Sequence, residues 1–388
     1  MNAGSPRRHI EPNMSEKPRI LHINKLYYPY IGGVETVVQN LCEQTAGKCD
    51  VEVLVCQTRG RMVREVVNGV RVTRAGSMGV WLSEPLSLSY PFLLRKFAPN
   101  FDLIHLHHPF PLGELAVLAF NPGHKMVFTW YCDIVRQKWL ARIYQPFLER
   151  LLDRVEAIIL IYPEAHLQTS LLQRRAHKCH VIPPGIEVEN YDLDDGLRQE
   201  VERIRSRHGN NLVLFVGRLV YYKGLQHLIA AMPSIDGNLL VVGDGPLRDR
   251  LQQQAVKLGV ADRVRFLGPL GDRELKAAFH ACDVLVLPST HRTEAFGMVQ
   301  LEAMACRKPV VNTRLDTGVP YVSLDRLTGL TVDPANPGAL AAAVNTLLGD
   351  PELRRVYGEN GRQRVLQEFT VQLMAERTRQ LYEKVLKR

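Results

Sequence analysis

The sequence predicts an α/β protein with two doubly wound, Rossmann-like domains that face a cleft. Short apolar segments typical of strands alternate with segments typical of helices along most of the 388 residues. This alternation indicates parallel sheets with helices on both faces. The segment Ile182-Pro183-Pro184-Gly185 ends one run of alternation, and an acidic stretch separates it from the second. We therefore expect domains at 18–190 and 191–370, with ligands beyond the carboxyl ends of the strands.

The first run is expected to form a sheet with helical crossovers. In the segment 66–72, Asn68-Gly69 lies between β-branched residues, which is typical of a tight hairpin. Apolar segments and amphipathic periodicity predict the other elements. The expected strands are 20–26, 51–56, 103–107, 126–131 and 157–162, and the expected helices are 33–46, 113–120 and 138–154.

The second run repeats the pattern and ends in a helical tail from Pro337 onward. The expected strands are 212–216, 239–242, 264–267, 284–287 and 309–312, and the expected helices are 225–231, 247–258, 274–281 and 296–305.

Composition narrows the class of protein. The chain is 46% hydrophobic, has a net charge of +9 and contains no long basic run, which argues against a dedicated nucleic-acid binder. A mildly basic surface suits anionic small substrates or an anionic membrane. Seven cysteines without a C-x-x-C pair favour a reducing compartment over a disulfide framework or a zinc site. We expect a cytoplasmic protein at the inner face of the membrane, with a disordered leader at 1–17 and Met14 as an alternative start.

The motif with the strongest chemical content is Glu294-Ala-Phe-Gly-Met-Val-Gln-Leu-Glu302. We expect Glu294 in a strand-to-helix loop, and residues 296–299 in the first helical turn, where free amides and the helix dipole form an anion site. Glu302 is expected about two turns inside the helix, where it accepts hydrogen bonds from a ribose diol. The alternative is a Glu294 that only favours the helix dipole and a solvated Glu302.

Two further loops carry weaker signals. Arg218 and Lys223 follow the strand 212–216 and together neutralise a diphosphate, or else form an ordinary solvated loop. Gly32 and Gly33 allow a phosphate or sugar to approach the backbone closely, or else form a tight turn. Neither Gly32-Gly33 nor Gly243-Asp244-Gly245 completes G-x-G-x-x-G, which argues against an NAD site.

Taken together, these motifs resemble the retaining glycosyltransferases of family 4, which have the GT-B fold. The resemblance extends from about Ile20 to the C-terminus. It depends on the Gly-Gly-Val-Glu opening, the Val-Ile-Pro-Pro-Gly-Ile hinge, the Gly-Arg…Lys-Gly loop, the Gly-Asp-Gly-Pro turn and Glu-x-Phe-Gly…Leu-Glu-Ala-Met-Ala. Segments such as Lys25-Leu-Tyr-Tyr-Pro29 and His105-Leu-His-His-Pro109 further resemble bacterial mannosyltransferases of O-antigen and exopolysaccharide assembly.

The resemblance implies roles for named residues. Glu294 would contact the donor sugar, Glu302 the ribose, and Arg218 with Lys223 the diphosphate. Because those two cations supply the positive charge, neither a metal nor a cofactor is expected. The last helix, 371–386, would cross back onto the N-terminal domain. The donor contacts also include the amides of Gly33, Phe296, Gly297, Met298 and Val299, and a base-contacting loop that contains Leu270.

One position departs from the family pattern. Trp130-Tyr131-Cys132-Asp133 stands where those enzymes usually carry Trp-His-Ser-Asp. A tyrosine can donate a hydrogen bond to a sugar but is not a base near neutral pH. A retaining front-face reaction relies chiefly on the leaving phosphate as base. Two alternatives therefore stay open: a nucleotide-sugar-binding protein with weak or lost transfer, and a GT-B nucleotide-sugar epimerase.

Other polar clusters have competing interpretations. His105, His107 and His108 form a metal cluster or, in our interpretation, structural and substrate contacts, because ligand-spaced cysteines and carboxylates are missing. We expect His107, His108 and Asp133 to contact the acceptor. Asp192-Leu-Asp194 matches a D-x-D metal motif but is interpreted as an acidic linker. The basic, aromatic helix at 138–154 is either a membrane-resting face or an ordinary surface helix.

The expected activity is transfer of a hexose, most simply mannose from GDP-mannose, to a saccharide acceptor, in surface polysaccharide biosynthesis. The expected partners are a nucleotide sugar, a lipid-linked saccharide and an anionic membrane, without nucleic acid. The sequence leaves the base, sugar, acceptor, linkage and oligomeric state open.

Overall fold

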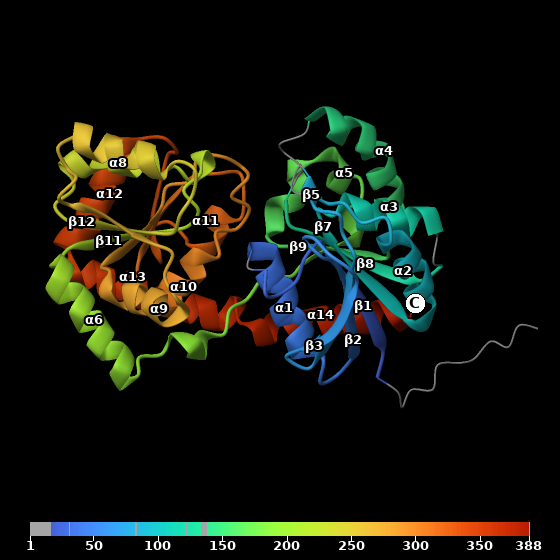
Figure 1. The fold of residues 1–388 in the computed structure, drawn as a ribbon. Coiled ribbons are helices and arrows are strands. Elements are labelled where there is room, and N and C mark those ends of the chain that lie inside the picture. Colours follow the sequence, from blue (N-terminus) through green and yellow to red (C-terminus); the bar gives the residue numbers. More distant parts are fainter. Residues whose placement is uncertain (1–16, 31, 82–83, 121–122, 133–137, 388) are drawn as a thin grey trace, which may run out of the picture.

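The computed structural model describes residues 17–387, apart from 31, 82–83, 121–122 and 133–137. It contains two largely parallel sheets, each flanked by helices (Figure 1). The first sheet has the order β10-β9-β8-β7-β1-β2-β4-β3, and β3 alone runs antiparallel to its neighbour. Its strands are β1 Arg19–Ile23, β2 Asp50–Cys56, β3 Val63–Val67, β4 Val70–Ala75, β7 Leu103–His108, β8 Lys125–Trp130, β9 Ala157–Leu160 and β10 Cys179–Val181, beside a separate small hairpin of β5 Val80–Trp81 and β6 Glu84–Pro85.

The expected turn between β3 and β4 is confirmed, because Asn68 and Gly69 both adopt left-handed backbone there. The three helices expected in this half begin close to their expected positions: α1 Gly33–Thr45, α3 Pro111–Phe120 and α4 Lys138–Arg154. Two shorter helices were not expected, α2 Tyr90–Phe97 and α5 Ser170–Gln173.

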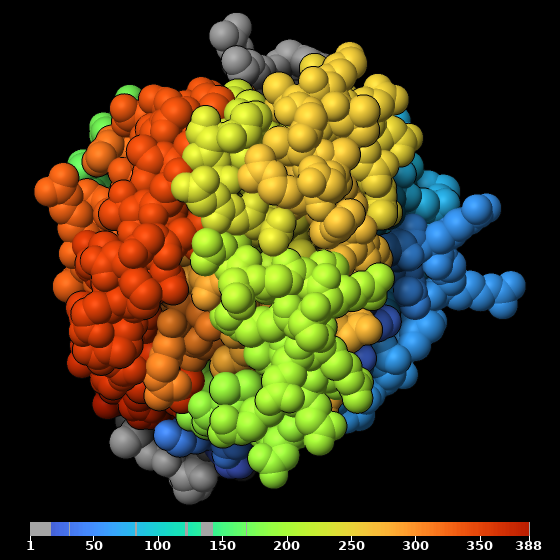
Figure 2. All heavy atoms as spheres, turned by 90° about the vertical axis from the view of Figure 1, so that its left-hand side faces the viewer, coloured from blue at the N-terminus to red at the C-terminus, as the bar shows by residue number. Residues whose placement is uncertain are grey.

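The second sheet has the order β13-β12-β11-β14-β15-β16 and is parallel throughout its described pairs. Its strands are β11 Leu212–Val216, β12 Asn238–Val242, β13 Val264–Gly268, β14 Val284–Leu287, β15 Val310–Thr313 and β16 Gly329–Val332. Its helices are α6 Asp195–His208, α7 Leu225–Ala231, α8 Arg248–Lys257, α9 Asp272–Ala281, α10 Val299–Ala305, α11 Val319–Val322, α12 Pro337–Gly349 and α13 Pro351–Glu368. Figure 2 shows the outer side of this domain, which segments from α6 (yellow-green) to α13 (red) form together.

The strand order of each sheet reverses at one point. In the first sheet β1 lies between β2 on one side and β7 on the other, and in the second sheet β11 lies between β12 and β14. Adjacent loops diverge at such a reversal and leave room beyond the strand ends, which is where ligands of doubly wound sheets bind. The fold therefore offers two positions for a site, after β1 and β7 and after β11 and β14.

The last helix, α14 Val371–Lys387, crosses back to the first sheet as expected (Figure 1). It packs against α1 and β8, and Lys125 Nζ donates to the carbonyls of Val385 and Leu386 at 2.9 Å each. The chain passes between the domains twice, at Ile186 and at Thr370, and backbone hydrogen bonds join the two passages. None of the helices in the described residues combines the length and the apolar character needed to cross a membrane.

Candidate active site

The expected diphosphate loop and the expected sugar loop meet at the reversal of the second sheet. Residues 217–224 follow β11 and residues 288–298 follow β14, and the two strands are hydrogen-bonded neighbours. The Thr290 amide donates to the Tyr222 carbonyl at 2.8 Å. Gly224 has a φ of +71°, and a Cβ there would overlap the carbonyl oxygen of Pro288. Only glycine allows the two loops to lie this close together.

This contact brings Lys223 and Glu294 together. Lys223 Nζ lies 2.6 Å from Glu294 Oε2, and the Ser289 hydroxyl donates to the same carboxyl group at 3.0 Å. Glu294 is only 8% exposed, so the ion pair is well shielded from water. Arg218 is exposed on the same loop, and no residue in the described part of the chain pairs with it. Among the described residues, this loop thus carries one cation that is paired with a carboxylate and one that is exposed and unpaired.

The expected first helical turn at residues 296–299 is wrong. Gly297 has a φ of +74°, and α10 begins only at Val299. A Cβ at Gly297 would lie 2.6 Å from Leu287 Cδ2, so glycine is required where the chain turns. Within the described residues, the amides of Phe296, Gly297 and Met298 donate to no protein acceptor, so they stay available to a ligand although they are not helical. The Phe296 side chain instead packs edge-on against Phe369 in the core.

Glu302 consequently lies in the first turn of α10 rather than two turns inside it. The Tyr191 hydroxyl donates to Glu302 Oε1 at 3.0 Å. Burial raises the pKa of the Glu302 carboxyl to about 7, while the Tyr191 hydrogen bond and the positive charge of Lys223 act in the opposite direction. Sequence reasoning missed Tyr191, which lies 111 residues away next to the acidic linker.

The same linker explains the D-x-D motif. Asp192 pairs with Arg362 at 2.6 Å, and Asp194 caps α6 by accepting from the Leu197 amide at 2.6 Å. Both carboxylates therefore have structural partners. Leu270 follows β13 and is half-buried, and β12 separates β13 from β11. The structure places Leu270 at the same edge of the sheet as Lys223 but not next to it.

The Gly32-Gly33 turn lies at the N-terminus of α1. Gly33 is exposed, and a Cβ built on it would meet nothing within 4 Å. The Glu35 carboxylate folds back over Gly32, and burial raises the pKa of that carboxyl. Glu35 occupies the position where an anionic ligand would meet the first free amides of the helix. Sequence reasoning treated this segment only as a backbone platform and gave Glu35 no role.

The histidines of β7 separate onto two faces, as alternation in a strand requires. His105 and His107 are buried with His22 of β1, and His22 Nδ1 lies 3.0 Å from His107 Nε2. His22 could not be expected in this cluster, because it lies 83 residues before its strand partner His105. Nitrogens of these three side chains lie within 4.8 Å of one another, which would allow them to hold a metal ion.

His108 points the other way. Its Nδ1 lies 3.0 Å from Glu114 Oε1, and its ring stacks on Trp130. The Tyr144 hydroxyl also donates to Glu114, so the carboxylate is firmly held. His108 Nε2 is buried and has no partner among the described residues. Asp133, the third expected acceptor contact, lies outside the described residues.

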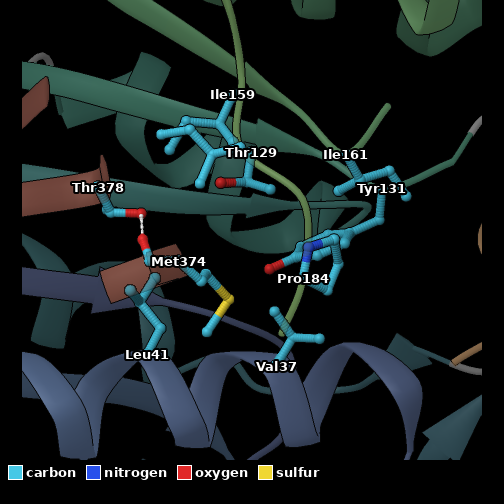
Figure 3. Close-up of a pocket in the computed structure, with 10 residues that line it drawn as sticks. Val37, Leu41, Thr129, Tyr131, Ile159, Ile161, Pro184, Met374 and Thr378 are labelled. Carbon is cyan, nitrogen blue, oxygen red and sulfur yellow. Dashed lines mark hydrogen bonds between the residues drawn. The ribbon is translucent and has the colours of Figure 1, made fainter. Parts of the chain in front are cut away.

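Tyr131 follows β8, and its hydroxyl lies 3.1 Å from His107 Nδ1. Burial raises the pKa of Tyr131, so the hydroxyl keeps its proton at neutral pH. Tyr131 and Thr129 line a small pocket with residues of α1, β9, α14 and the Pro184 hinge (Figure 3). On α4, the side chains of Ile143 and Phe147 are exposed, whereas those at 138–142 are outside the described set.

The chain is similar to glycosyltransferases over nearly its whole length. Family models match twice: "Glycosyl transferase 4-like domain" at residues 32–185 and "Glycosyl transferases group 1" at 198–364. O-antigen chain mannosyltransferase C of Escherichia coli is 32% identical, with 95% of this chain and 99% of that protein covered. D-rhamnosyltransferase WbpZ of Pseudomonas aeruginosa is also 32% identical, with 91% of this chain and 92% of that protein covered.

Solved structures show the same fold. The crystal structure of Anabaena HepE in complex with UDP superimposes with a TM-score of 0.78, at 20% identity, with 94% of this chain and all of that chain covered. Two Rossmann-like domains with a returning C-terminal helix, two matching family models and a full-length relative at 32% identity agree with one another. The chain belongs to the group 1 and 4-like glycosyltransferases, which have the GT-B fold.

Proposed function

We propose that the protein is a retaining glycosyltransferase that moves mannose from GDP-mannose to a lipid-linked saccharide during assembly of a surface polysaccharide of the O-antigen type. The observation that carries the proposal is the Lys223–Glu294 ion pair at the reversal of the second sheet. It combines a cation for a diphosphate with a shielded carboxylate for a sugar. The names of the Escherichia coli and Pseudomonas aeruginosa relatives support a hexosyl or deoxyhexosyl donor, and the name of the Escherichia coli relative supports an O-antigen product.

In this proposal each donor group meets one part of the site. The diphosphate binds to the positively charged side chains of Lys223 and Arg218. Lys223 then contacts phosphate oxygens in place of part of its present contact with Glu294. Glu302 accepts from the ribose hydroxyls. The acceptor oxygen bonds to the anomeric carbon on the face from which the diphosphate departs, and the acceptor proton passes to the leaving phosphate oxygen. The cations stabilise the charge that develops on the diphosphate.

The acceptor is proposed to bind at the first sheet, beside His108. Its buried Nε2 has no partner among the described residues, whereas Glu114 fixes its Nδ1 side. A hydroxyl of a sugar could use such a nitrogen as acceptor or donor. His107 is less suited, because both of its ring nitrogens already make hydrogen bonds inside the domain.

A nucleotide-sugar-binding protein without transfer is the second candidate. It is favoured by Tyr131, whose hydroxyl is buried against His107 and whose raised pKa prevents it from acting as a base. The epimerase alternative has no observation of its own in the structure.

One experiment separates these functions. Melting temperatures are measured with GDP, UDP, ADP, GDP-mannose, UDP-glucose and UDP-N-acetylglucosamine, because a ligand of the folded state raises its stability. The proposal predicts a shift with GDP and GDP-mannose that Arg218→Ala removes, and donor hydrolysis that Glu294→Gln removes. Binding without hydrolysis or transfer would support the second candidate, and a converted nucleotide sugar would indicate an epimerase. A shift with UDP compounds alone would refute the GDP-mannose assignment.

A further inference from the structure

A continuous chain of buried hydrogen bonds joins Tyr131 to Thr129 through the three histidines and the last helix. Its members come from β1, β7, β8, the residue that follows β8, and α14, and both of its ends line the pocket in Figure 3. The links are Tyr131 Oη to His107 Nδ1 at 3.1 Å, His107 Nε2 to His22 Nδ1 at 3.0 Å, His22 Nε2 to Tyr382 Oη at 3.5 Å, Tyr382 Oη to His105 Nδ1 at 2.5 Å and His105 Nε2 to Thr129 Oγ1 at 2.7 Å.

Every member of this chain contributes one proton. Burial lowers the pKa of His22 to about 3 and holds those of His105 and His107 well below their ordinary value, so the three rings are neutral. A neutral imidazole has one donor nitrogen and one acceptor nitrogen. Burial also raises the pKa of Tyr131 and of Tyr382, so both hydroxyls keep their protons. The six members therefore carry one proton more than the five links require.

Three arrangements satisfy all five links, because a hydroxyl can accept twice. In one of them Tyr382 accepts from the histidine on each side, but Tyr382 is buried and makes no other hydrogen bond among the described residues, so its own proton would have no acceptor, which costs free energy. Two arrangements remain, and each leaves the spare proton at an end of the chain. In one, Tyr131 donates inward and all three histidines carry their proton on Nε2, so the spare proton is on Thr129. In the other, Thr129 donates inward and all three carry it on Nδ1, so the Tyr131 hydroxyl receives a bond from His107 and its own proton is free. The direction of the chain thus determines whether Tyr131 offers a proton or a lone pair to a ligand.

We propose that Tyr382 is a positioning residue for Tyr131. Its hydroxyl is the single link between the stretch Tyr131–His107–His22 and the stretch His105–Thr129. Because this hydroxyl accepts from one stretch and donates to the other, all the hydrogen bonds run in the same direction from donor to acceptor. The packing of α14, which places the hydroxyl, therefore determines how Tyr131 meets the donor sugar. This step rests on the proposed function and adds to it that the Tyr131 hydroxyl, which lines the pocket, meets the donor sugar.

A metal ion is the competing explanation of the three histidines. Two imidazole nitrogens on a tetrahedral zinc ion are separated by about 3.3 Å, because each Zn–N bond is about 2.0–2.1 Å. His22 Nδ1 and His107 Nε2 lie closer, at 3.0 Å, which is an ordinary hydrogen-bond distance. Each ring nitrogen of the cluster also already has a protein partner.

The test reads the tautomers directly. The full chain, labelled with ¹⁵N-histidine, is studied by NMR at pH 7 without nucleotide. The ¹⁵N chemical shift of each ring nitrogen shows whether that nitrogen carries the proton. The wild type is expected to show one tautomer at His22, His105 and His107 alike. Tyr382→Phe removes the hydroxyl that joins the two stretches, so the proton of each ring is expected on the nitrogen that still has an acceptor. His22 and His107 then carry Nδ1–H and His105 carries Nε2–H.

Two matched variants at the ends predict opposite results. Thr129→Val removes the acceptor at one end, so all three rings should carry Nδ1–H. Tyr131→Phe removes the group at the other end, so all three should carry Nε2–H. A mixed set in the wild type, a uniform set in Tyr382→Phe, or displacement of the ring protons by added Zn²⁺ would overturn the proposal.

Kinetics then separate this proposal from the proposed function. With an active donor, the effect on kcat should follow the wild-type tautomer, while KM for the nucleotide sugar stays nearly unchanged. If the wild type carries Nε2–H, Tyr382→Phe reverses the hydrogen bond between His107 and Tyr131 and should lower kcat about tenfold; if it carries Nδ1–H, the variant leaves that bond as it is and kcat should stay within about twofold. An unchanged kcat in a variant that reverses the bond would show that the chain has no influence on transfer. A protein that binds no nucleotide sugar would refute the proposed function while the tautomers could still be uniform. Melting curves of each variant identify any that fails to fold.

Discussion

The raised pKa of Glu302 predicts that nucleotide affinity increases with pH. Ribose hydroxyls donate to a carboxylate, so binding favours the ionised form. With a pKa of about 7, the ionised fraction is about one tenth at pH 6 and about nine tenths at pH 8. Since the apparent dissociation constant is the intrinsic value divided by the competent fraction, GDP should bind about tenfold more tightly at pH 8 than at pH 6. Isothermal titration calorimetry across this range measures the change.

Two variants make the test specific. The terminal phosphate of the nucleotide also ionises near pH 6, so Glu302→Gln serves as the control that retains this contribution alone. Tyr191→Phe removes the hydrogen bond that lowers the pKa, so its affinity increase should occur at higher pH than in the wild type. The reasoning fails if wild type and Glu302→Gln follow the same curve. In the absence of ligand the sign is opposite: a raised carboxyl pKa makes the free energy of unfolding fall as pH rises from about 4.5 to about 7.

Three further outcomes are expected. Lys223→Met leaves the Glu294 carboxylate without its cation and should lower the free energy of unfolding by about 2 kcal/mol, as measured by urea denaturation. Arg218→Ala should change the free energy of unfolding by less than about 0.5 kcal/mol in the same assay. Calorimetry should show weaker GDP binding in both variants. Gly297→Ala should cost about 1–3 kcal/mol of stability, because alanine is strained at a φ of +74° and its Cβ meets Leu287; an unchanged urea midpoint would contradict the turn. Gly33→Ala meets nothing within 4 Å, so the melting temperature should not fall, and any loss of GDP-mannose affinity would report direct ligand contact.

Local chemistry was enough to predict most of the architecture. Apolar segments followed by glycine or proline located β11 and β14 at their observed bounds, and Asn68-Gly69 located the hairpin. The prediction failed at α10, where periodicity alone extended the helix back to Phe296. The left-handed backbone of Gly297 depends on packing against Leu287 of the preceding strand, which a pattern of apolar residues does not contain.

The candidate site could be predicted only in part, because its contacts join distant segments. Lys223 and Glu294 were each found in their own motif, but their ion pair requires β11 and β14 to be neighbours. Tyr191 and His22 were missed because neither lies in a motif with its partner. Their contacts exist only after the acidic linker has folded against α10 and β1 has paired with β7.

The position of Tyr131 gives the departure from the family pattern a structural meaning. A neutral histidine at this position can carry its proton on either of two ring nitrogens, whereas a tyrosine carries its proton on its one oxygen. Here that oxygen lies against His107, the first of three coupled rings at the reversal of the first sheet. Whether the group at this position donates or accepts a hydrogen bond therefore depends on the tautomers of the buried histidines behind Tyr131. In our proposal Tyr131 therefore meets a sugar as donor or as acceptor according to the direction of these hydrogen bonds, and α14, which carries Tyr382, takes part in setting that direction.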